Sequence, residues 1–372
     1  MGLLYRRQIR VLHIISGDLW AGAESMAFQL MIGLNRINDV DLHLIVLNEG
    51  RLERQCREAG INCYLIPEKN LSFIQIVLRS VKIVRRLNPN VIHSHRYKEN
   101  IIAAITAAFN GRSKLVTTRH GRPEKVKELF HKRVISALDT ACLRWIFSEI
   151  IAVSQDTAEY LIQMFGPNSK KISVIHNGIA PSFHPILHQS NSQRGSITIG
   201  SAGRLFPVKQ FDVFIRIAKL VCQEKPEIRF VIAGEGPERE KIESLIIRYG
   251  LKDKIQLLGH LDDMQAFYKG IDLYINTSAH EGSPMTILEA MAVGLPVIAF
   301  SVAGLPEILS DGRDGFVIPD GNYEGFASRI IELTDDYKRL NVIGLHACRK
   351  VADRFSVVQM VNSYLAIYLR VN

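Results

Sequence analysis

The sequence lacks the features that mark a membrane-spanning or disulfide-rich protein. No apolar run approaches the ~20 residues that a membrane-spanning helix requires. The 5 cysteines are scattered without a CxxC pair, which argues against a disulfide framework and against a thiolate metal site. Residues 1–17 make a poor signal peptide, because the apolar stretch soon meets Gly17 and Asp18 and no small-residue cleavage site follows. We therefore expect a cytoplasmic protein.

Several motifs of other protein classes are also missing. No G-x-G-x-x-G follows the first predicted strand, which argues against a nicotinamide-binding protein. The absence of a zinc finger, an RNP-type aromatic string and a basic low-complexity arm leaves nucleic-acid binding as a weak alternative, so we expect no nucleic-acid partner. The single Asp-x-Asp string, 39–41, begins a predicted strand instead of ending one. We therefore expect no metal ligands and no cofactor.

Acidic residues are scarce in the first half of the chain. Residues 1–186 carry 25 Lys and Arg against 15 Asp and Glu, a balance of +10, whereas the remainder carries 21 against 22. The net charge of +9 therefore belongs to the first half. A one-sided positive field attracts anionic surfaces such as phospholipid headgroups, although it also serves solubility, and both explanations stay open.

Short β-branched runs alternate with helical patterns along both halves, which predicts parallel sheets covered by helices. With 372 residues, the chain is long enough for two domains. The fold class is therefore α/β with two doubly wound parallel sheets, whose ligands bind beyond the carboxyl ends of the strands. The predicted strands are 10–16, 41–47, 61–66, 91–95, 114–120, 150–154, 172–178, 197–204, 228–236, 255–260, 273–278, 296–300 and 315–319.

One segment rich in Pro, Ser, Asn and Gln separates the two sets of strands. It predicts a linker over 183–195. The domains are then 1–182 on the amino-terminal side and 196–355 on the carboxyl-terminal side. We expect the final helix, 356–372, to pack back on the first domain.

The strongest local pattern is SAHEGSPMTILEAMAVG, which begins at Ser278. It predicts that a loop with Glu281 precedes a helix whose N-cap is Ser283, with Pro284 at its first position and Gly294 at its end. The start of this helix offers free N–H groups to an anion, and carboxylates accept hydrogen bonds from sugar hydroxyls.

A second pattern, GSAGRLFPVKQFD, begins at Gly200. It places Arg204 in a loop after a strand and Lys209 at the opening of the next helix. Two cations at this spacing around a turn can clamp a diphosphate, the arginine through its planar fork and the lysine as a point charge.

These two patterns resemble the motifs of retaining glycosyltransferase family 4. EGSPMTILE has that family's E-x7-E spacing, and GRLFPVKQFD resembles its G-R-L-x-x-x-K-x-x-D string. Further motifs follow in the family's customary order: GDLWAGAE, VIHSH, TTRHG, IIAVS, VIHNGI, VIAGEGPE and VAGLPEIL. The resemblance implies a GT-B fold, in which two Rossmann-like domains face each other across a cleft, with the second holding a nucleotide-sugar.

The resemblance also implies roles for particular residues. Arg204 and Lys209 would stabilise the diphosphate, Glu289 would bind the nucleotide ribose, Glu281 would orient the donor sugar, and His120 would face that sugar. The implied catalytic residues are His120, Arg204, Lys209 and Glu281. The implied donor-binding residues are Gly17, Gly22, Gly203, Arg204, Lys209, Glu281, Gly282, Ser283, Pro284, Met285, Thr286 and Glu289.

The implied reaction is transfer of a hexose-type sugar, with retention, to a glycan or lipid-linked acceptor in bacterial cell-surface polysaccharide synthesis. The donor would be a UDP-sugar, with a GDP-sugar as the other choice, and no metal would be needed. A GT-B nucleotide-sugar 2-epimerase is the alternative enzyme. Two positions depart from the family pattern: Ala21 replaces the first glycine of a Gly-Gly pair, and Ser283 stands where an apolar residue is frequent.

Two basic amphipathic segments of the first half, 73–87 and 125–147, bear on the acceptor side. Each is a helix that either rests on an anionic membrane surface or packs on the sheet with solvated cations. The first reading makes the protein peripheral on the cytoplasmic face of the membrane. His93 and His95 flank a strand end, where they either line the cleft or serve as structural histidines.

Overall fold

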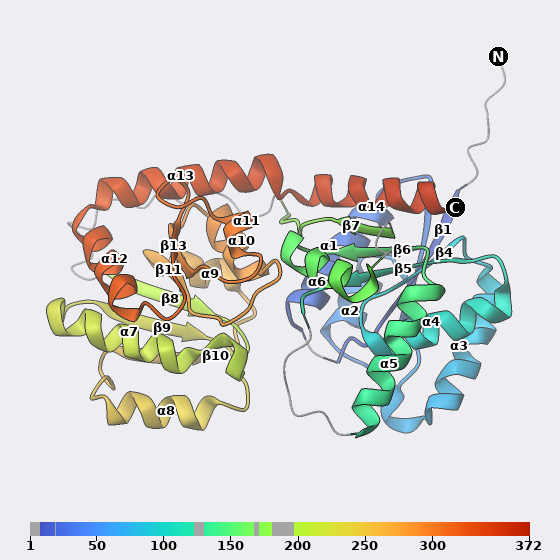
Figure 1. Ribbon diagram of the computed structural model, residues 1–372, viewed down its shortest axis with the longest axis horizontal. Coiled ribbons are helices and arrows are strands. Elements are labelled where there is room, and N and C mark those ends of the chain that lie inside the picture. Colours follow the sequence, from blue (N-terminus) through green and yellow to red (C-terminus); the bar gives the residue numbers. More distant parts are fainter. Residues whose placement is uncertain (1–7, 19, 123–129, 167–170, 181–196) are drawn as a thin grey trace, which may run out of the picture. The chain divides into compact units, whose positions relative to one another are not determined.

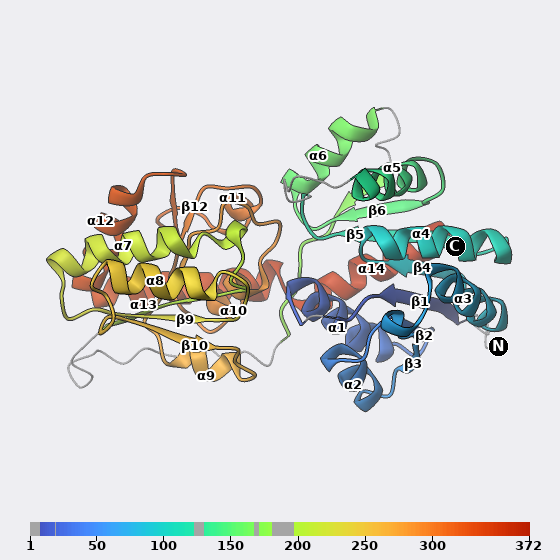
Figure 2. The same cartoon turned by 90° about the horizontal axis from the view of Figure 1, so that it is seen from below.

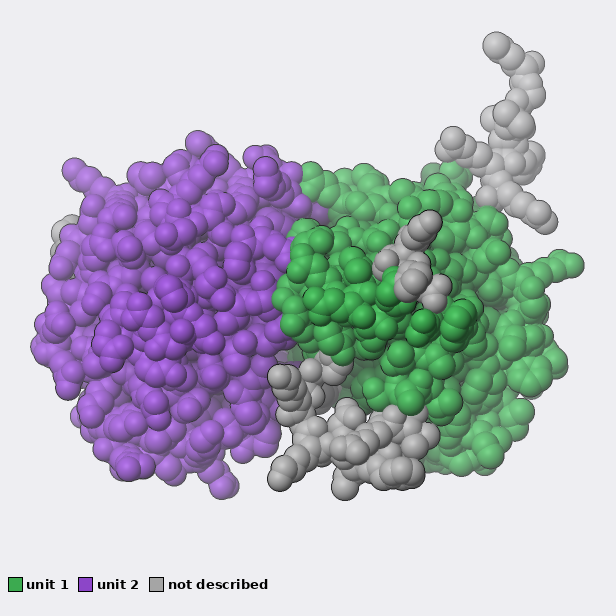
Figure 3. All heavy atoms as spheres, in the orientation of Figure 1, with its two compact units in different colours: residues 1–178, 357–372 green, residues 179–356 purple. Residues whose placement is uncertain are grey.

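The computed structural model describes residues 8–18, 20–122, 130–166, 171–180 and 197–372, without the side chains of 130–134. The chain divides into two compact units, coloured separately in Figure 3: unit 1 (1–178 with 357–372) and unit 2 (179–356). The predicted linker, 183–195, lies outside the described residues. The C-terminal helix α14 (Val357–Val371) belongs to unit 1, where it packs against α1 (Gly22–Asn35).

Unit 1 contains a seven-stranded sheet in the order β3-β2-β1-β4-β5-β6-β7, and all of its neighbouring strands run parallel (Figure 1). Most of their buried side chains are apolar, on both faces, as expected for a sheet covered by helices on both sides. The strands are β1 (Ile9–Ile15), β2 (Val40–Val46), β3 (Asn62–Leu65), β4 (Val91–Ser94), β5 (Lys114–Arg119), β6 (Glu149–Ala152) and β7 (Ile172–Val174).

The helices of unit 1 cover both faces of this sheet. From β1 the chain adds strands first in one direction and then in the other, so right-handed crossovers place the helices of the two sets on opposite faces. On one face α3, α4 and α5 pack in a row. The helices besides α1 and α14 are α2 (Arg51–Glu58), the 3-10 turn η1 (Glu68–Asn70), α3 (Phe73–Leu87), α4 (Tyr97–Asn110), α5 (Phe130–Trp145) and α6 (Gln155–Phe165).

Unit 2 contains a six-stranded parallel sheet in the order β10-β9-β8-β11-β12-β13. The strands are β8 (Thr198–Ala202), β9 (Arg229–Ala233), β10 (Ile255–Gly259), β11 (Leu273–Asn276), β12 (Val297–Phe300) and β13 (Phe316–Ile318). The sheet is again enclosed by helices, with α7 packed against α8 and α12, and α10 packed against α13 (Figure 2). The helices are η4 (Pro207–Lys209), α7 (Phe211–Glu224), α8 (Arg239–Arg248), α9 (Met264–Lys269), α10 (Met285–Ala292), α11 (Leu305–Ile308), α12 (Tyr323–Asp335) and α13 (Tyr337–Arg354).

The predicted fold class is confirmed: every predicted strand range overlaps a strand, and both sheets are parallel. The helix predicted over 73–87 has these same ends, and a capping box between Ser72 and Gln75 fixes its start. Of the second basic helix the structure describes Phe130–Trp145. Among the described residues, no helix is both long and apolar enough to cross a membrane.

In each sheet the strand order reverses beside the first strand, between β1 and β4 in unit 1 and between β8 and β11 in unit 2. The loops that leave the carboxyl ends of two such strands diverge to opposite faces and leave room between them. Ligands of doubly wound sheets bind at this point. The structure therefore places a candidate site in each unit.

Candidate functional site

In unit 2 the loops after β8 and β11 are tied together at the reversal of strand order. The Ala279 N–H donates to the Val208 carbonyl at 2.9 Å, and the Thr277 hydroxyl donates to the Gln210 carbonyl at 3.1 Å. Thr277 is 1% exposed, so its hydroxyl serves this attachment and not the solvent. The two loops therefore hold the Arg204–Lys209 segment against the segment that contains Glu281.

Lys209 and Glu281 meet at the centre of this arrangement. The Lys209 ammonium lies 2.5 Å from Oε1 of Glu281. The same oxygen accepts hydrogen bonds from the Ser278 hydroxyl at 2.7 Å and from the Asn276 amide at 3.4 Å. Burial alone would raise the pKa of Glu281, but the nearby Lys209 ammonium and these hydrogen bonds outweigh it, so the pKa lies below its ordinary value. Glu281 is therefore an ionised carboxylate held in a fixed orientation.

Arg204 lies on the same loop as Lys209, and its guanidinium contacts an aromatic ring. Its guanidinium lies 4.6 Å from the centre of the Phe206 ring, a cation–π contact. Among the described residues, no carboxylate forms an ion pair with it. Arg204 thus keeps its hydrogen-bond donors for an anion.

Glycines bring the β8 and β9 loops close enough to share hydrogen bonds. A Cβ at Gly234, whose φ is +140°, would lie 1.9 Å from the Gly203 carbonyl oxygen. A Cβ at Gly236 would lie 2.5 Å from the Leu205 carbonyl oxygen. The Leu205 N–H donates to the Glu235 carbonyl at 2.9 Å across this contact. The backbone around Arg204 is therefore held in place by the GEG loop after β9.

Glu289 lies on α10 and pairs with a residue that the sequence patterns did not identify. The Tyr268 hydroxyl, on α9, donates to Oε2 of Glu289 at 2.8 Å. Burial raises the pKa of Glu289 to about 7, even though the hydrogen bond from Tyr268 lowers it. The carboxyl of Glu289 therefore changes its charge near neutral pH.

The predicted cap of α10 is wrong by one position. The helix begins at Met285, and its N-cap is Pro284 in extended conformation, one residue after Ser283. Proline fits here because its ring fixes φ near −69° and the position needs no N–H. Gly294 follows the helix with φ +82°, as a glycine after a helix often does.

The prediction that Lys209 opens a helix is also wrong. It ends the 3-10 turn η4, and α7 begins at Phe211 after Gln210 with φ +47°. In the loop after β11 and the start of α10, the remaining predicted residues, Gly282 to Met285, are buried, and Thr286 is partly buried. The Gly304 N–H donates to the Glu281 carbonyl at 2.9 Å, so the VAG loop after β12 also joins the site.

The other three predicted site residues, Gly17, Gly22 and His120, belong to unit 1. Gly17 has φ +70°, and a Cβ there would lie 2.7 Å from a Val46 methyl group, so only glycine fits. Ala21 is extended at φ −131° and acts as the N-cap of α1, so its replacement of a glycine requires no positive φ. Gly22 begins α1 and is exposed.

His120 follows β5 and is partly buried, and neither of its ring nitrogens has a hydrogen-bond partner among the described residues. Burial, with smaller contributions from Arg96 and Arg119, lowers the pKa of His120 to about 3. The imidazole is therefore neutral at physiological pH.

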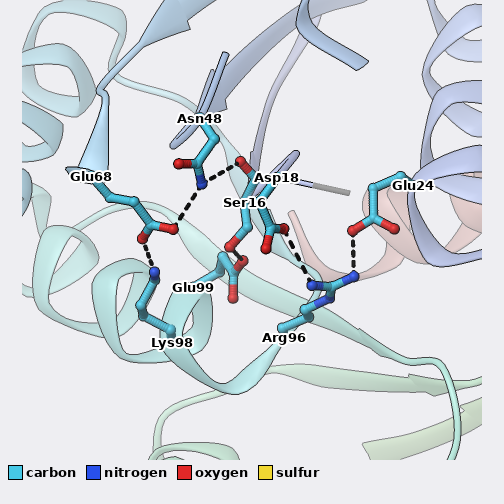
Figure 4. A network of polar contacts seen from close by, with 8 residues as sticks. All are labelled: Ser16, Asp18, Glu24, Asn48, Glu68, Arg96, Lys98 and Glu99. Carbon is cyan, nitrogen blue, oxygen red and sulfur yellow. Dashed lines mark hydrogen bonds and ion pairs between the residues drawn. The ribbon is translucent and has the colours of Figure 1, made fainter. Parts of the chain in front are cut away.

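A polar network lies at the carboxyl ends of β1, β2 and β4 in unit 1 (Figure 4). Arg96 pairs with the buried Glu24 and lies 3.6 Å from Asp18. In the same figure Lys98 pairs with Glu68, which accepts a hydrogen bond from Asn48, and Ser16 donates to the buried Glu99. The network holds four carboxylates and two cations, so the excess positive charge of the first half lies elsewhere.

Several site residues were missed by the sequence patterns: Tyr268, Asn276, Thr277 and Ser278. Three of them form the polar string Asn-Thr-Ser at the end of the buried strand β11, a position where ligand contacts are expected. Tyr268 had no comparable signal, because an aromatic residue on a short helix is ordinarily a core residue.

The sequence matches two family models over successive parts of the chain. Residues 20–183 match the model described as Glycosyltransferase Family 4, and residues 184–347 match the one described as Glycosyl transferases group 1. With two doubly wound units, these matches define a glycosyltransferase of the GT-B fold. The chain belongs to glycosyltransferase family 4, as its motifs predicted.

Named relatives and solved structures agree with this assignment. UDP-Gal:alpha-D-GlcNAc-diphosphoundecaprenol alpha-1,3-galactosyltransferase of Escherichia coli is 26% identical over 369 residues, which cover 91% of this chain and 94% of that protein. One component of human phosphatidylinositol N-acetylglucosaminyltransferase is 31% identical over 68% of this chain and 53% of the human protein. Anabaena HepE, solved with UDP and glucose, has a TM-score of 0.84 at 21% identity, covering 97% of this chain and 99% of that chain, which supports the fold.

Proposed function

We propose that this glycosyltransferase moves a hexose-type sugar from a UDP-sugar to a lipid-linked or glycan acceptor, with retention of the anomeric configuration. The observation that carries the proposal is the Lys209–Glu281 ion pair beside Arg204, at the reversal of strand order in unit 2. It combines cations for a diphosphate with an ionised carboxylate for sugar hydroxyls.

The leaving nucleotide accounts for the cations. As the bond from the sugar to the diphosphate breaks, negative charge develops on the departing phosphate. Arg204 and Lys209 stabilise that charge, together with the free N–H groups at the start of α10. This supply of positive charge makes a divalent metal unnecessary, so activity is expected to persist in the presence of a chelator.

Glu289 is suited to bind the nucleotide ribose. One of its oxygens accepts the Tyr268 hydroxyl. The other is assigned to the vicinal hydroxyl pair of the ribose, because a carboxylate oxygen accepts such hydrogen bonds. The Escherichia coli relative is named for a UDP-linked donor, and HepE was solved with UDP. Both support uridine over guanosine as the base.

The state of Glu281 argues against a covalent glycosyl-enzyme intermediate at this residue. Its Oε1 is engaged by Lys209, Ser278 and Asn276. A carboxylate stabilised by three such donors is a weak nucleophile. The reaction then proceeds by attack of the acceptor on the face from which the diphosphate leaves, with that phosphate accepting the acceptor's proton. The protein contributes position and electrostatic stabilisation.

Binding of the acceptor is assigned to unit 1. Its carboxylate-rich network offers Asp18, 43% exposed, to sugar hydroxyls, and His120 is assigned to the donor sugar. Both named relatives act on lipid-linked or lipid molecules by their names, which supports a lipid-linked acceptor in cell-surface polysaccharide synthesis. A 2-epimerase and a nucleic-acid-binding protein are not favoured, because the family matches point to glycosyl transfer.

The basic helix α3 is assigned to the anionic surface of the membrane. Ile74 and Leu78 are 70% and 63% exposed on it, one helical turn apart. They share the exposed side with Arg79, Lys82, Arg85 and Arg86. Exposed apolar side chains among cations are typical of helices that lie on a membrane surface.

The donor is tested by a thermal-shift screen of UDP-, GDP- and ADP-sugars against the full chain. A ligand that binds only the native state raises the melting temperature, and we expect the largest rise with UDP-sugars. The stabilising donor is then incubated with a lipid-linked acceptor, and release of UDP is measured. Release that requires the acceptor supports transfer. Conversion of the donor without an acceptor would instead indicate epimerisation.

A further inference from the structure

Five side chains with polar groups line one face of the unit 1 sheet near the carboxyl ends of its central strands. His13 on β1 pairs in register with His93 on β4, which pairs with Val116 on β5. Side chains alternate between the two faces of a sheet with a period of two. His95, Thr118 and His120 therefore lie on the same face of the sheet as His13 and His93. His13, His93 and His95 are at most 2% exposed.

Hydrogen bonds connect these side chains to the C-terminal helix α14. His95 Nε2 lies 3.0 Å from His13 Nδ1, and His13 Nε2 lies 3.4 Å from the Tyr368 hydroxyl. The same hydroxyl lies 2.6 Å from His93 Nδ1. His93 Nε2 lies 2.9 Å from the Thr118 hydroxyl, which lies 3.0 Å from the Tyr364 hydroxyl. The chain of contacts therefore runs from His95 through His13, Tyr368, His93 and Thr118 to Tyr364.

The direction in which these hydrogen bonds donate follows from one atom at the His95 end of the series. Among the described residues, His95 Nδ1 is buried without a hydrogen-bond partner. If the bonds ran from Thr118 towards His95, this atom would carry a buried unpaired N–H, the rarer and costlier arrangement. In the opposite direction it is a bare acceptor. His95, His13 and His93 are then all neutral Nε2–H tautomers, and each donates onward towards Thr118.

Burial agrees with the neutral forms, since it lowers the pKa of His13 to about 3 and those of His93 and His95 well below the ordinary value. A metal is the other reading, because one nitrogen from each of the three histidines lies within 4.8 Å of the others. Both nitrogens of His93, however, are engaged by hydroxyl groups. A metal would have to displace one of them.

His95, at the start of this series of hydrogen bonds, contacts His120, the residue assigned to the donor sugar. The His95 and His120 rings stack with centroids 5.7 Å apart and planes inclined by 23°. His120 has no hydrogen bond of its own among the described residues, so ring contact is what orients it.

We propose that His95 is a positioning residue that holds the His120 ring, and that the one-directional hydrogen-bond chain to Tyr368 fixes His95 in turn. This rests on the proposed function in one respect only, the place of His120 beside the donor sugar. It gives the C-terminal helix a part in positioning His120, through Tyr368 and His95.

Two tyrosines on α14 provide a matched pair of variants. Tyr368 and Tyr364 are both fully buried and stand one turn apart, but Tyr368 occupies the middle of the chain and Tyr364 its end. Tyr368→Phe removes the acceptor of His13 and the donor to His93. We expect kcat to fall about tenfold with the KM for the donor within about twofold, whereas Tyr364→Phe stays near wild type. A ring about one ångström out of place can cost about a hundredfold.

The ring contact is tested separately at His95. His95→Ala removes the stacking partner of His120, and we expect kcat to fall at least about tenfold. His95→Phe restores a flat ring but lacks the N–H that joins it to His13, so we expect it to recover part of that loss and to stay below wild type. Equal kcat values in Tyr368→Phe and Tyr364→Phe, or no recovery in His95→Phe, would overturn the proposal.

Nuclear magnetic resonance of histidine-labelled protein decides the same question without activity. In wild type at pH 7 we expect Nε2–H tautomers at His13, His93 and His95, and a rigid His120 ring that becomes mobile in His95→Ala. Nδ1–H tautomers, a cationic ring, a bound metal or an unchanged His120 would refute the chain or the contact. Absence of transferase activity in wild type, with these signals as expected, would instead count against the proposed function.

Discussion

The ammonium of Lys209 lies 2.5 Å from Oε1 of Glu281, although 72 positions separate the two residues in the chain. The contact joins the loops after β8 and β11, and it leaves Arg204 on the same loop without a carboxylate partner among the described residues. Charge for the phosphates and orientation for the sugar therefore come from one connected group.

Substitution of either cation tests this arrangement. Lys209→Ala and Arg204→Ala each remove a charge that stabilises the departing phosphate, and we expect kcat to fall about a hundredfold or more, as for a lost oxyanion-hole donor. Lys252→Ala, at an exposed position of unit 2, serves as the control and should retain full turnover. Near-normal kcat in both site variants would rule out their role in stabilising the phosphate.

Glu289 predicts a pH dependence of donor binding. Its pKa is raised to about 7, so below that pH the carboxyl is mostly protonated and must lose its proton before it can accept two ribose hydroxyls. We expect the affinity for a UDP-sugar, whose phosphates do not titrate in this range, to rise about tenfold from pH 6 to pH 8, since the ionised fraction of Glu289 rises by that factor.

Glu289→Gln removes this titration, so its weaker affinity for the UDP-sugar should be flat over the same range. Calorimetric titration with the UDP-sugar at several pH values, without acceptor, makes the measurement. The free energy of unfolding depends on pH in the opposite sense to donor affinity. A raised carboxyl pKa stabilises the folded state at low pH, and this contribution is lost as pH rises through about 7. A wild-type affinity independent of pH would contradict the assignment of Glu289.

The sequence was sufficient for the sheets and for the charged members of the site, because each depends on local patterns. Buried parallel strands are apolar runs, and the spacings around Glu281 and Arg204 follow directly from the loops that carry them. The cap of α10 was misplaced because Ser283 and Pro284 both favour a helix start, and only the backbone decides which residue is helical.

The partners of those residues could not be predicted in this way. The contact of Tyr268 with Glu289 joins α9 to α10, and that of His13 with His95 joins β1 to the loop after β4. Both depend on the order of strands in a sheet, which no local pattern contains. His93 and His95 were left open between cleft-lining and structural roles, and the hydrogen bonds of His93 with Tyr368 and Thr118 assign it a structural one.

The contact between the β8 and β9 loops predicts unequal effects of two alanine substitutions. Gly234→Ala would drive a Cβ to 1.9 Å from the Gly203 carbonyl oxygen, which is backbone and cannot rotate away. We expect a loss of about 3 kcal/mol of stability, seen as a lower melting temperature in thermal unfolding. At Gly203 itself an added Cβ meets only the Lys209 side chain, at an ordinary 3.5 Å. Gly203→Ala should therefore melt like wild type, and a wild-type melting temperature for Gly234→Ala would contradict the contact.

Helix α3 predicts salt-dependent binding to anionic vesicles. We expect the protein to sediment with phosphatidylglycerol-containing liposomes at low salt and to be released as salt is raised, because screening weakens the attraction of its cations. Ile74→Ser with Leu78→Ser removes two exposed apolar side chains, at 70% and 63% exposure, and should weaken binding by about tenfold or more. Ile247→Ser is the matched control, since Ile247 is 62% exposed on α8 of unit 2. Absence of binding at low salt, or equal weakening by the control, would exclude α3 as the membrane contact.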